Sequence, residues 1–194
     1  MAKSLSYEQL TSLLAVARKH SELDYLALLI GFNHGLRATE LVGGWLTDKK
    51  GKRSWYPGLT KDNVVDGHLV VQRLKGSHRT IQALLPSERN AVLHLAATCE
   101  GRFFPISRKT LWLHAKQYAE EAGVPMFLAT PHRICKHTCA MLGLKGGMGL
   151  NELQTYLGHV SGSSTMAYLR VNDEVASSAF EKAVVSVGAI LKRT

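Results

Sequence analysis

Cysteine is scarce in this sequence, and long hydrophobic runs are missing from it. The 194 residues include three cysteines, Cys99, Cys135 and Cys139, and so small and odd a set argues against a disulfide scaffold. No apolar run approaches the roughly 20 residues that a membrane helix needs, and no apolar segment follows Met1 as it would in a secretory signal. We therefore expect a globular protein of a reducing cytoplasm that has no membrane partner.

Metal-binding spacings are also missing. Cys135 and Cys139 lie four residues apart and close to His132, but the CxxC pairs of structural zinc sites do not occur. The nine histidines are dispersed and show no HExxH spacing, which makes a metalloenzyme a weak alternative. We predict that the two thiols are buried on one helix face and bind no metal.

Acidic residues are outnumbered. The sequence has 24 basic against 15 acidic residues, a formal net charge of +9. An excess of this size indicates a polyanionic partner, with nucleic acid first and an anionic membrane surface second. Basic residues recur along the whole chain and form no tail, so the sequence predicts a folded basic surface.

Helical patterns dominate the chain. Residues 6–9 (Ser-Tyr-Glu-Gln) form a capping box, and leucines follow at helical spacing, so a helix is predicted from about residue 7. The last predicted helix, over 173–192, carries an apolar stripe that packs either within the chain or against a neighbouring subunit. The helices expected between these two cover about 24–33, 39–43, 86–97, 107–122, 132–144, 151–157 and 164–168.

A small sheet is predicted in the middle of the chain. Val64-Val65 leads through the turn signal Asp66-Gly67 into a strand over 68–74, and a second turn at 75–77 leads into a strand over 78–84. Lys75 is thereby placed at a hairpin tip. The expected fold class is α+β, mainly α: a helical bundle with one three-stranded antiparallel sheet.

Residues 45–58 are predicted to form a loop in which basic and aromatic residues alternate. Two interpretations remain open. The cations could meet DNA phosphates while the rings stack on bases or sugars, or the aromatics could fold back on the core. On the first interpretation the DNA-binding residues of this loop are Lys49, Lys50, Lys52 and Arg53.

Residues suited to phosphodiester chemistry are spread over several elements. Opening a phosphodiester without a metal needs an aligned nucleophile, cations that neutralise the phosphoryl oxygens, and an acid that protonates the departing oxygen. The residue types that fit these tasks are Arg37, Lys75, a cluster from His132 to Lys136, His159 and Tyr168.

Four motifs in fixed order resemble the boxes of the tyrosine recombinase, or phage integrase, family. They are GLRATEL at 35–41, LKGSHRT at 74–80, TPHRICKHTCA at 130–140, and LGH at 157–159 with SSTMAY at 163–168. The resemblance runs from about residue 5 to past Tyr168. It implies the family's catalytic-domain fold and site-specific DNA recombination, in a bacterial or phage-infected cell.

The resemblance also implies roles for individual residues. Tyr168 is expected to attack the scissile phosphate, leaving a 3′-phosphotyrosine and a free 5′-hydroxyl. Arg37 would clamp phosphoryl oxygens, and Lys75 would protonate the leaving oxygen. His159 would donate a hydrogen bond to the phosphate, and His132 would assist proton transfer.

The third box departs from the family pattern His-x-x-Arg-His. Here the segment is His-Arg-Ile-Cys-Lys-His over 132–137, one residue longer. Lys136 takes the place of the second arginine when the box is aligned from His137, and Arg133 is the rival second cation. On a helix His132 and Lys136 lie on nearly the same face, so we assign Lys136 to catalysis and Arg133, with Arg79, to DNA binding.

Chain length bears on organisation. The resemblance implies one catalytic domain over 1–194 without the family's N-terminal DNA-clamping domain, and a homotetramer on double-stranded DNA. The segment at 173–194 either docks on a neighbouring subunit of that tetramer or packs within its own chain. Two alternatives to a recombinase stay open. One is a type IB topoisomerase-like enzyme, and the other is a DNA-binding relative whose altered third box has weakened or abolished cleavage.

Overall fold

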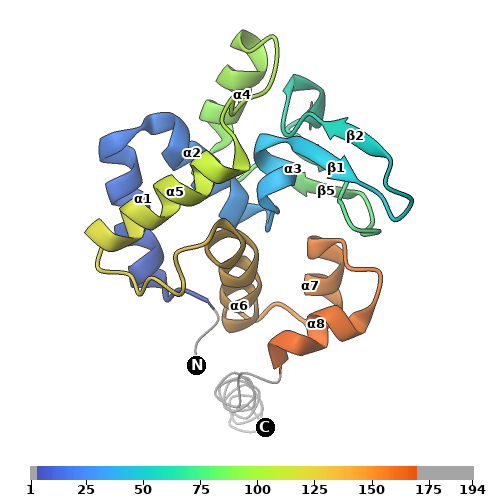
Figure 1. Ribbon diagram of the computed structural model, residues 1–194. Helices are drawn as coiled ribbons and strands as arrows, with labels where there is room; N and C mark the ends of the chain where they lie inside the picture. The colour runs from blue at the N-terminus through green and yellow to red at the C-terminus, as the bar shows by residue number, and fades with distance from the viewer. Residues whose placement is uncertain (1–3, 170–194) are drawn as a thin grey trace, which may run out of the picture.

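The computed structural model describes residues 4–169, with side chains up to residue 166, and confirms a mainly helical α+β fold (Figure 1). Its α-helices are α1 (Tyr7–His20), α2 (Glu22–Asn33), α3 (Ala38–Val42), α4 (Arg89–Thr98), α5 (Arg108–Glu121), α6 (Thr138–Lys145), α7 (Leu150–Leu157) and α8 (Gly162–Leu169). Its strands are β1 (Gly44–Thr47), β2 (Arg53–Tyr56), β3 (Val64–Val65), β4 (His68–Val71) and β5 (Thr80–Ala83). The helix predicted over 173–192 lies outside the described residues.

The first helix begins where the sequence predicts. Ser6 Oγ accepts a hydrogen bond from the backbone N–H of Gln9 (3.2 Å), and the Gln9 side chain accepts one from the N–H of Ser6 (2.9 Å), which completes the capping box. Helix α1 packs against α2 and α5, and its apolar face, including Leu10 and Leu13, is buried. These three helices pack together in the part of the molecule that contains the N-terminal half of the main core (Figure 1).

The three-stranded sheet β3-β4-β5 is confirmed, with strands shorter than predicted. Val65 pairs with His68 across a turn at Asp66 and Gly67, which both have positive φ (48° and 74°). That backbone is the one a two-residue hairpin turn of type I′ requires. Strand β5 packs against α7, so the hairpin and the C-terminal helices lie side by side.

The prediction of a loop over 45–58 is wrong, because the structure has a hairpin there. Strands β1 and β2 pair in antiparallel register, with Trp45 opposite Trp55. The strands are four residues long and largely exposed on both faces, so they lack the alternation of apolar and polar residues that identifies a half-buried strand. The sequence alone therefore contained no periodic signal for this sheet.

A break in helix geometry separates two parts of the predicted helix 132–144. Residues His132–His137 form a π-helical turn, and α6 follows directly. Helices α6 and α7 enclose a small second apolar cluster, which includes Met141 and Leu153.

Candidate active site

A cleft of about 510 Å³ lies where four segments of the chain meet. These segments are the start of α3, the β4–β5 turn, the π-helical turn, and the connection from α7 to α8. Five of the six predicted catalytic residues line it, namely Arg37, Lys75, His132, Lys136 and His159. The structure thus brings together residues up to 122 positions apart in the sequence.

The predicted nucleophile belongs to a helix that borders this cleft. Ser164, in the first turn of α8, lines the cleft, and Tyr168 follows four residues later on the same helix. Positions four apart lie on one face of a helix. The side chain of Tyr168 lies outside the described residues.

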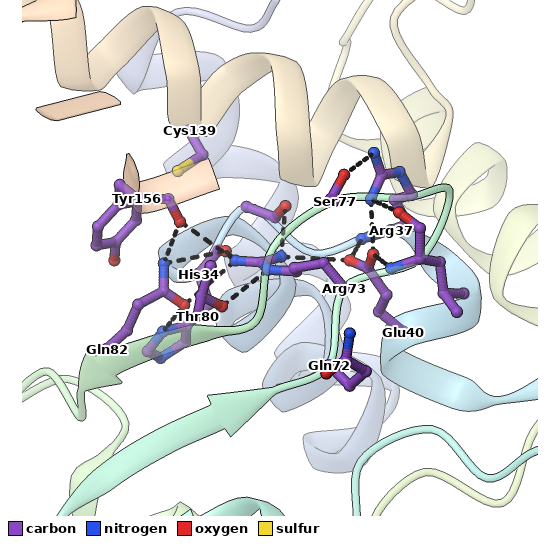
Figure 2. A network of polar contacts seen from close by, with 12 residues as sticks. His34, Arg37, Glu40, Gln72, Arg73, Ser77, Thr80, Gln82, Cys139 and Tyr156 are labelled. Atoms are coloured by element: carbon purple, nitrogen blue, oxygen red, sulfur yellow. Dashed lines mark hydrogen bonds and ion pairs between the residues drawn. The ribbon is translucent and has the colours of Figure 1, made fainter. Parts of the chain in front are cut away.

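Arg37 is held by a set of fixed acceptors at the start of α3 (Figure 2). Its Nη1 donates to Glu40 Oε1 (2.7 Å) and to the carbonyl of Leu74 (3.1 Å), and its Nη2 donates to Ser77 Oγ (3.3 Å). The side chain is 18% exposed. The guanidinium is therefore fixed in orientation and still reaches the cleft.

Glu40, which the sequence did not assign to the site, organises this corner. Its buried carboxylate accepts the N–H of Arg37 (2.9 Å), the N–H of Leu74 (2.9 Å), and bonds from the guanidinium groups of Arg37 and Arg73. Burial raises the pKa of Glu40, but Arg73, the two N–H groups and Arg37 together hold this pKa below its usual value. The signal for this role was its spacing: a glutamate three residues after an N-cap position reaches back to the cap.

Lys75 occupies the tip of the β4–β5 hairpin, as predicted. Lys75 and Gly76 both have positive φ (60° and 69°), and the N–H of Ser77 points to the carbonyl of Leu74 (3.4 Å). A lysine in this backbone region is uncommon, and such conformations gather at functional sites. The turn places the exposed Lys75 at the cleft.

The π-helical turn accommodates the additional residue of the third box. The N–H of Thr138 donates to the carbonyl of Arg133, five residues earlier. A π-turn inserts one residue into a helix, so the longer box fits here while His132 and Lys136, four positions apart, both line the cleft. Arg133 points elsewhere: its guanidinium lies 5.9 Å from the ring centre of Phe127.

Lys136 is the most buried cation of the cleft. The residue is 3% exposed, and its Nζ has no hydrogen-bond partner among the described side chains. Burial and the nearby charge of Arg37 lower the pKa of Lys136 to about 8. A buried ammonium with free donors is a strong site for an anionic oxygen.

Gly158 forms the turn after α7 that places His159 in the cleft. It ends α7 with a φ of +67°, and its carbonyl accepts the N–H of His78 (2.8 Å). A Cβ at this position would lie 2.6 Å from the carbonyl oxygen of His78. The left-handed backbone and the close approach both require glycine, so the Leu-Gly-His motif docks the histidine against the lysine hairpin.

His159 and His132 are neutral at pH 7. Burial, followed by the charges of Lys136 and Arg37, lowers the pKa of His159 to about 4. Burial, then the neighbouring His137 and the charges of Lys136, Arg37 and Lys75, lowers the pKa of His132 to about 4. The Nδ1 of His159 lies 2.9 Å from Thr165 Oγ, which leaves Nε2 able to carry the ring proton toward a phosphate.

The predicted DNA-binding lysines sit on the β1–β2 turn, outside the cleft. Lys49, Lys50 and Lys52 are exposed there, and the Asp48 carboxylate fixes the turn by accepting the N–H groups of Lys50 (2.8 Å) and Lys52 (2.9 Å). Arg79 is also exposed, but it lines a separate hollow between β5 and α7. Arg79 and these lysines therefore face different parts of the surface.

A second, larger cleft of about 970 Å³ adjoins the first through His132, which lines both. Trp45 and Trp55 are 54% and 48% exposed in it, so these two rings do not fold back on the core, whereas Tyr56 is half-buried and donates to the carbonyl of Gln72 (3.1 Å). Arg53 lies over the ring of Trp45 (5.0 Å) and Arg102 over that of Trp55 (5.6 Å). Trp112, Arg108 and Lys109 also line this cleft.

The cysteines behave as the sequence predicts for buried thiols. Cys135 and Cys139 are buried, and burial raises the pKa of each to about 12. Among residues 4–169 no group of three histidine, cysteine or acidic side chains could hold a metal ion. No helix in this described range is both long and apolar enough to cross a membrane.

Curated proteins with similar sequences are tyrosine recombinases. XerA of Pyrococcus furiosus is 30% identical over 195 residues, which cover 94% of this chain and 62% of that protein. XerD of Vibrio cholerae is 29% identical over 196 residues, covering 90% of this chain and 59% of its own length. The chain thus spans less than two thirds of these relatives.

Solved structures share the fold. A crystal structure of XerA recombinase superposes with a TM-score of 0.66 at 19% identity, covering 94% of this chain and 64% of the other. The catalytic domain of bacteriophage HP1 integrase gives 0.65 at 17% identity and covers 92% and 93% of the two chains. The model of the phage integrase family matches residues 3–175. This chain belongs to the phage integrase family, whose members include the Xer tyrosine recombinases, and it carries their catalytic-domain fold.

Proposed function

We propose that this chain performs site-specific DNA recombination, cutting and rejoining DNA strands through a 3′-phosphotyrosine at Tyr168. One observation supports this proposal most directly. Arg37, Lys75, Lys136 and two neutral histidines line the same cleft, and the helix that contains Tyr168 borders it. Neutralising a phosphate and donating a proton to its leaving oxygen need this combination of groups.

The proposed reaction needs no cofactor. The Tyr168 oxygen forms a bond to phosphorus while the bond from phosphorus to the 5′-oxygen breaks. Neutral His132 assists removal of the phenol proton, and Lys75 supplies a proton to the 5′-oxygen. Arg37 and Lys136 neutralise the non-bridging oxygens, and His159 donates to one of them. Attack by another 5′-hydroxyl reverses the steps and joins a new strand.

The proposed DNA surface extends from the cleavage cleft into the larger one beside it. Exposed tryptophans and arginines line that second cleft, and the lysines of the β1–β2 turn stand near it along the hairpin. Cations meet the phosphates of a strand and rings stack on its sugars or bases. Lys49, Lys50, Lys52 and Arg53 are assigned to this surface, and Arg133 and Arg79 to contacts farther from the hairpin.

The relatives support double-stranded DNA as the partner. One structural neighbour is XerH recombinase bound to its difH substrate, and another is the Tn1549 transposon integrase in complex with transposon end DNA. Exchange between two duplexes involves four strands to be cut, which favours a homotetramer on DNA. We place this activity in the cytoplasm of a bacterial or phage-infected cell.

A covalent adduct is the direct test. The protein is incubated with a pool of nicked duplexes of randomised sequence, in which loss of a short fragment traps the cleaved product. Denaturing gels should show an adduct that Tyr168→Phe does not form, and sequencing the trapped DNA identifies the site. If no adduct depends on Tyr168, the protein is instead a DNA-binding member of the family that does not cleave DNA. Supercoil relaxation without paired sites would instead indicate a topoisomerase.

A further inference from the structure

A fully buried arginine, Arg73, lies next to the cleft. Arg73 follows β4 and its side chain has no exposed surface. Its guanidinium lies at the centre of the polar network in Figure 2. Its Nε donates to Thr80 Oγ (2.9 Å), its Nη1 to the carbonyl of Gly35 (3.1 Å), and its Nη2 to the carbonyl of His34 (2.6 Å).

Further acceptors complete the shell around this guanidinium. Nη1 also pairs with Glu40 Oε2 (3.2 Å), and Nη2 reaches the Gln82 amide oxygen (3.3 Å) and the carbonyl of Tyr156 (3.4 Å). All three nitrogens therefore have acceptors. A charge buried this deeply is stable only when it is paired and hydrogen-bonded in this way.

Each partner belongs to a segment that leads to a residue of the cleft. The carbonyls of His34 and Gly35 precede Arg37 by three and two residues, and the carbonyl of Tyr156 precedes His159 by three. Arg73 itself precedes Lys75 by two residues. One guanidinium thus sets the relative positions of three segments that are far apart in the sequence.

Strand β5 is oriented to serve this arginine. Thr80 and Gln82 face inward and are both 4% exposed, whereas Ile81 between them is 64% exposed. A strand that followed hydrophobicity alone would bury Ile81 and expose its polar neighbours. The inward side chains accept hydrogen bonds from Arg73, which accounts for the reversed pattern.

Glu40 connects Arg73 to the phosphate-facing arginine. One oxygen of this carboxylate pairs with Arg73, and the other accepts from the Arg37 guanidinium at 2.7 Å. We propose that Arg73 is a positioning residue: through Glu40 and the carbonyls before α3 it holds Arg37 in the orientation that meets the scissile phosphate. The kinetic test of this inference assumes the proposed function, because it measures DNA cleavage; the positioning of Arg37 by Arg73 does not depend on it.

The conservative variant Arg73→Lys tests the proposal, because it keeps the charge and loses most of the hydrogen bonds. Adduct formation is measured on the trapped DNA site, once with the natural phosphodiester and once with a neutral methylphosphonate at the scissile position. We expect a ten- to hundredfold slower reaction on the phosphodiester at unchanged DNA affinity, and less than a threefold loss on the methylphosphonate, which has no charge for Arg37 to neutralise. Equal losses on both substrates, or no loss, would overturn the proposal.

Two further variants separate positioning from stability. Tyr118→Phe removes a buried hydrogen bond to Asp24 (2.6 Å), far from the cleft, and should reduce thermal stability with unchanged cleavage. Should Arg73→Lys fail to fold, Thr80→Val removes one hydrogen bond of Arg73 and is expected to show a smaller loss with the same dependence on substrate charge. Equal losses of Thr80→Val on both substrates would count against the proposal.

A measurement without DNA distinguishes failure of this inference from failure of the proposed function. In protein labelled with ¹⁵N-arginine, the Nε–H signal of Arg37, identified by its loss in Arg37→Lys, should report a rigid side chain in the parent and a mobile one in Arg73→Lys. If the parent forms no adduct but this mobility appears, recombination is wrong and the positioning role stands. An equally rigid Arg37 in both proteins would refute the role.

Discussion

Thr165 Oγ lies 2.9 Å from Nδ1 of His159, and Tyr168 follows Thr165 by three residues on the same helix. Both partners of this bond are buried, with Thr165 fully inaccessible. This hydrogen bond therefore joins His159, the proposed phosphate donor, to the helix that carries Tyr168, the proposed nucleophile. Its geometry fixes the orientation of the imidazole ring and leaves the opposite nitrogen for the substrate.

Removing this bond should slow cleavage. Thr165→Val keeps the shape of the side chain but cannot bond Nδ1, so the ring loses its fixed tautomer and orientation. A loss of about 1.4 kcal/mol in the transition state corresponds to about a tenfold lower rate of adduct formation. Thr165→Ser keeps a hydroxyl and should stay within about threefold of the parent. A valine variant as fast as the serine variant would show that the bond has no role in cleavage.

The pH dependence of cleavage should report the buried lysine. Lys136 has a pKa lowered to about 8, so it is charged below that pH and loses its charge as the pH rises through it. We expect the second-order rate of adduct formation by the parent to fall above about pH 8. Lys136→Arg keeps its charge at every accessible pH and should lack this fall. A parent and an arginine variant with the same alkaline profile would contradict the assignment.

The two rival cations of the third box can be separated directly. Lys136 lines the cleft, whereas Arg133 stacks on Phe127 outside it. Lys136→Ala should lower the cleavage rate by about 10²- to 10³-fold, the usual cost of removing one donor to a developing charge. Arg133→Ala should weaken DNA binding and leave the rate at saturating DNA within about threefold. Single-turnover rates at saturating DNA provide the comparison, and abolished cleavage in Arg133→Ala would transfer the role to Arg133.

The π-helical turn that presents these residues rests on a glycine of α2. A Cβ added at Gly31 would lie 2.6 Å from Sγ of Cys135, which belongs to the turn. Gly31→Ala should therefore destabilise the protein by about 1–3 kcal/mol, the usual cost of overpacking a core. With Cys135→Ala the sulfur is gone, and the same substitution should become neutral or stabilising because alanine favours helix by about 1 kcal/mol. Urea unfolding of the four proteins measures this coupling, and strictly additive effects would exclude it.

Much of the fold could be predicted because its signals are local. The capping box at Ser6, the turn at Asp66-Gly67 and the leucine spacings each specify an element within a few residues. The residues of the cleft were found differently, through motifs whose order matches a family. No periodicity relates Arg37 to His159, since their contact with one cleft depends on how the whole chain folds.

Other features could not be predicted, because they depend on contacts between distant residues. The six residues from His132 to His137 carry no local signal for a π-turn, which the structure shows by the bond from the N–H of Thr138 to the carbonyl of Arg133. Arg73 looked like an ordinary strand residue, since burial of a guanidinium requires acceptors contributed by several other segments of the chain. The β1–β2 hairpin failed prediction for the opposite reason: its strands bury too little to show a pattern.

That hairpin allows charge and stacking contributions to DNA binding to be separated. Lys49, Lys50 and Lys52 have exposed side chains suited to phosphates, whereas Trp45 presents a ring that is 54% exposed in the larger cleft. Replacing the three lysines with alanine should reduce the slope of log affinity against log salt by up to about 2.7, at about 0.9 for each phosphate that is no longer neutralised. Trp45→Ala should weaken binding by about 1–3 kcal/mol and leave the slope unchanged, since stacking releases no counterions. Binding titrations from low to moderate salt measure both effects. If the triple variant kept the parent's slope, the hairpin would lie away from DNA; a changed slope in Trp45→Ala would mean that the ring acts by holding Arg53 rather than by stacking.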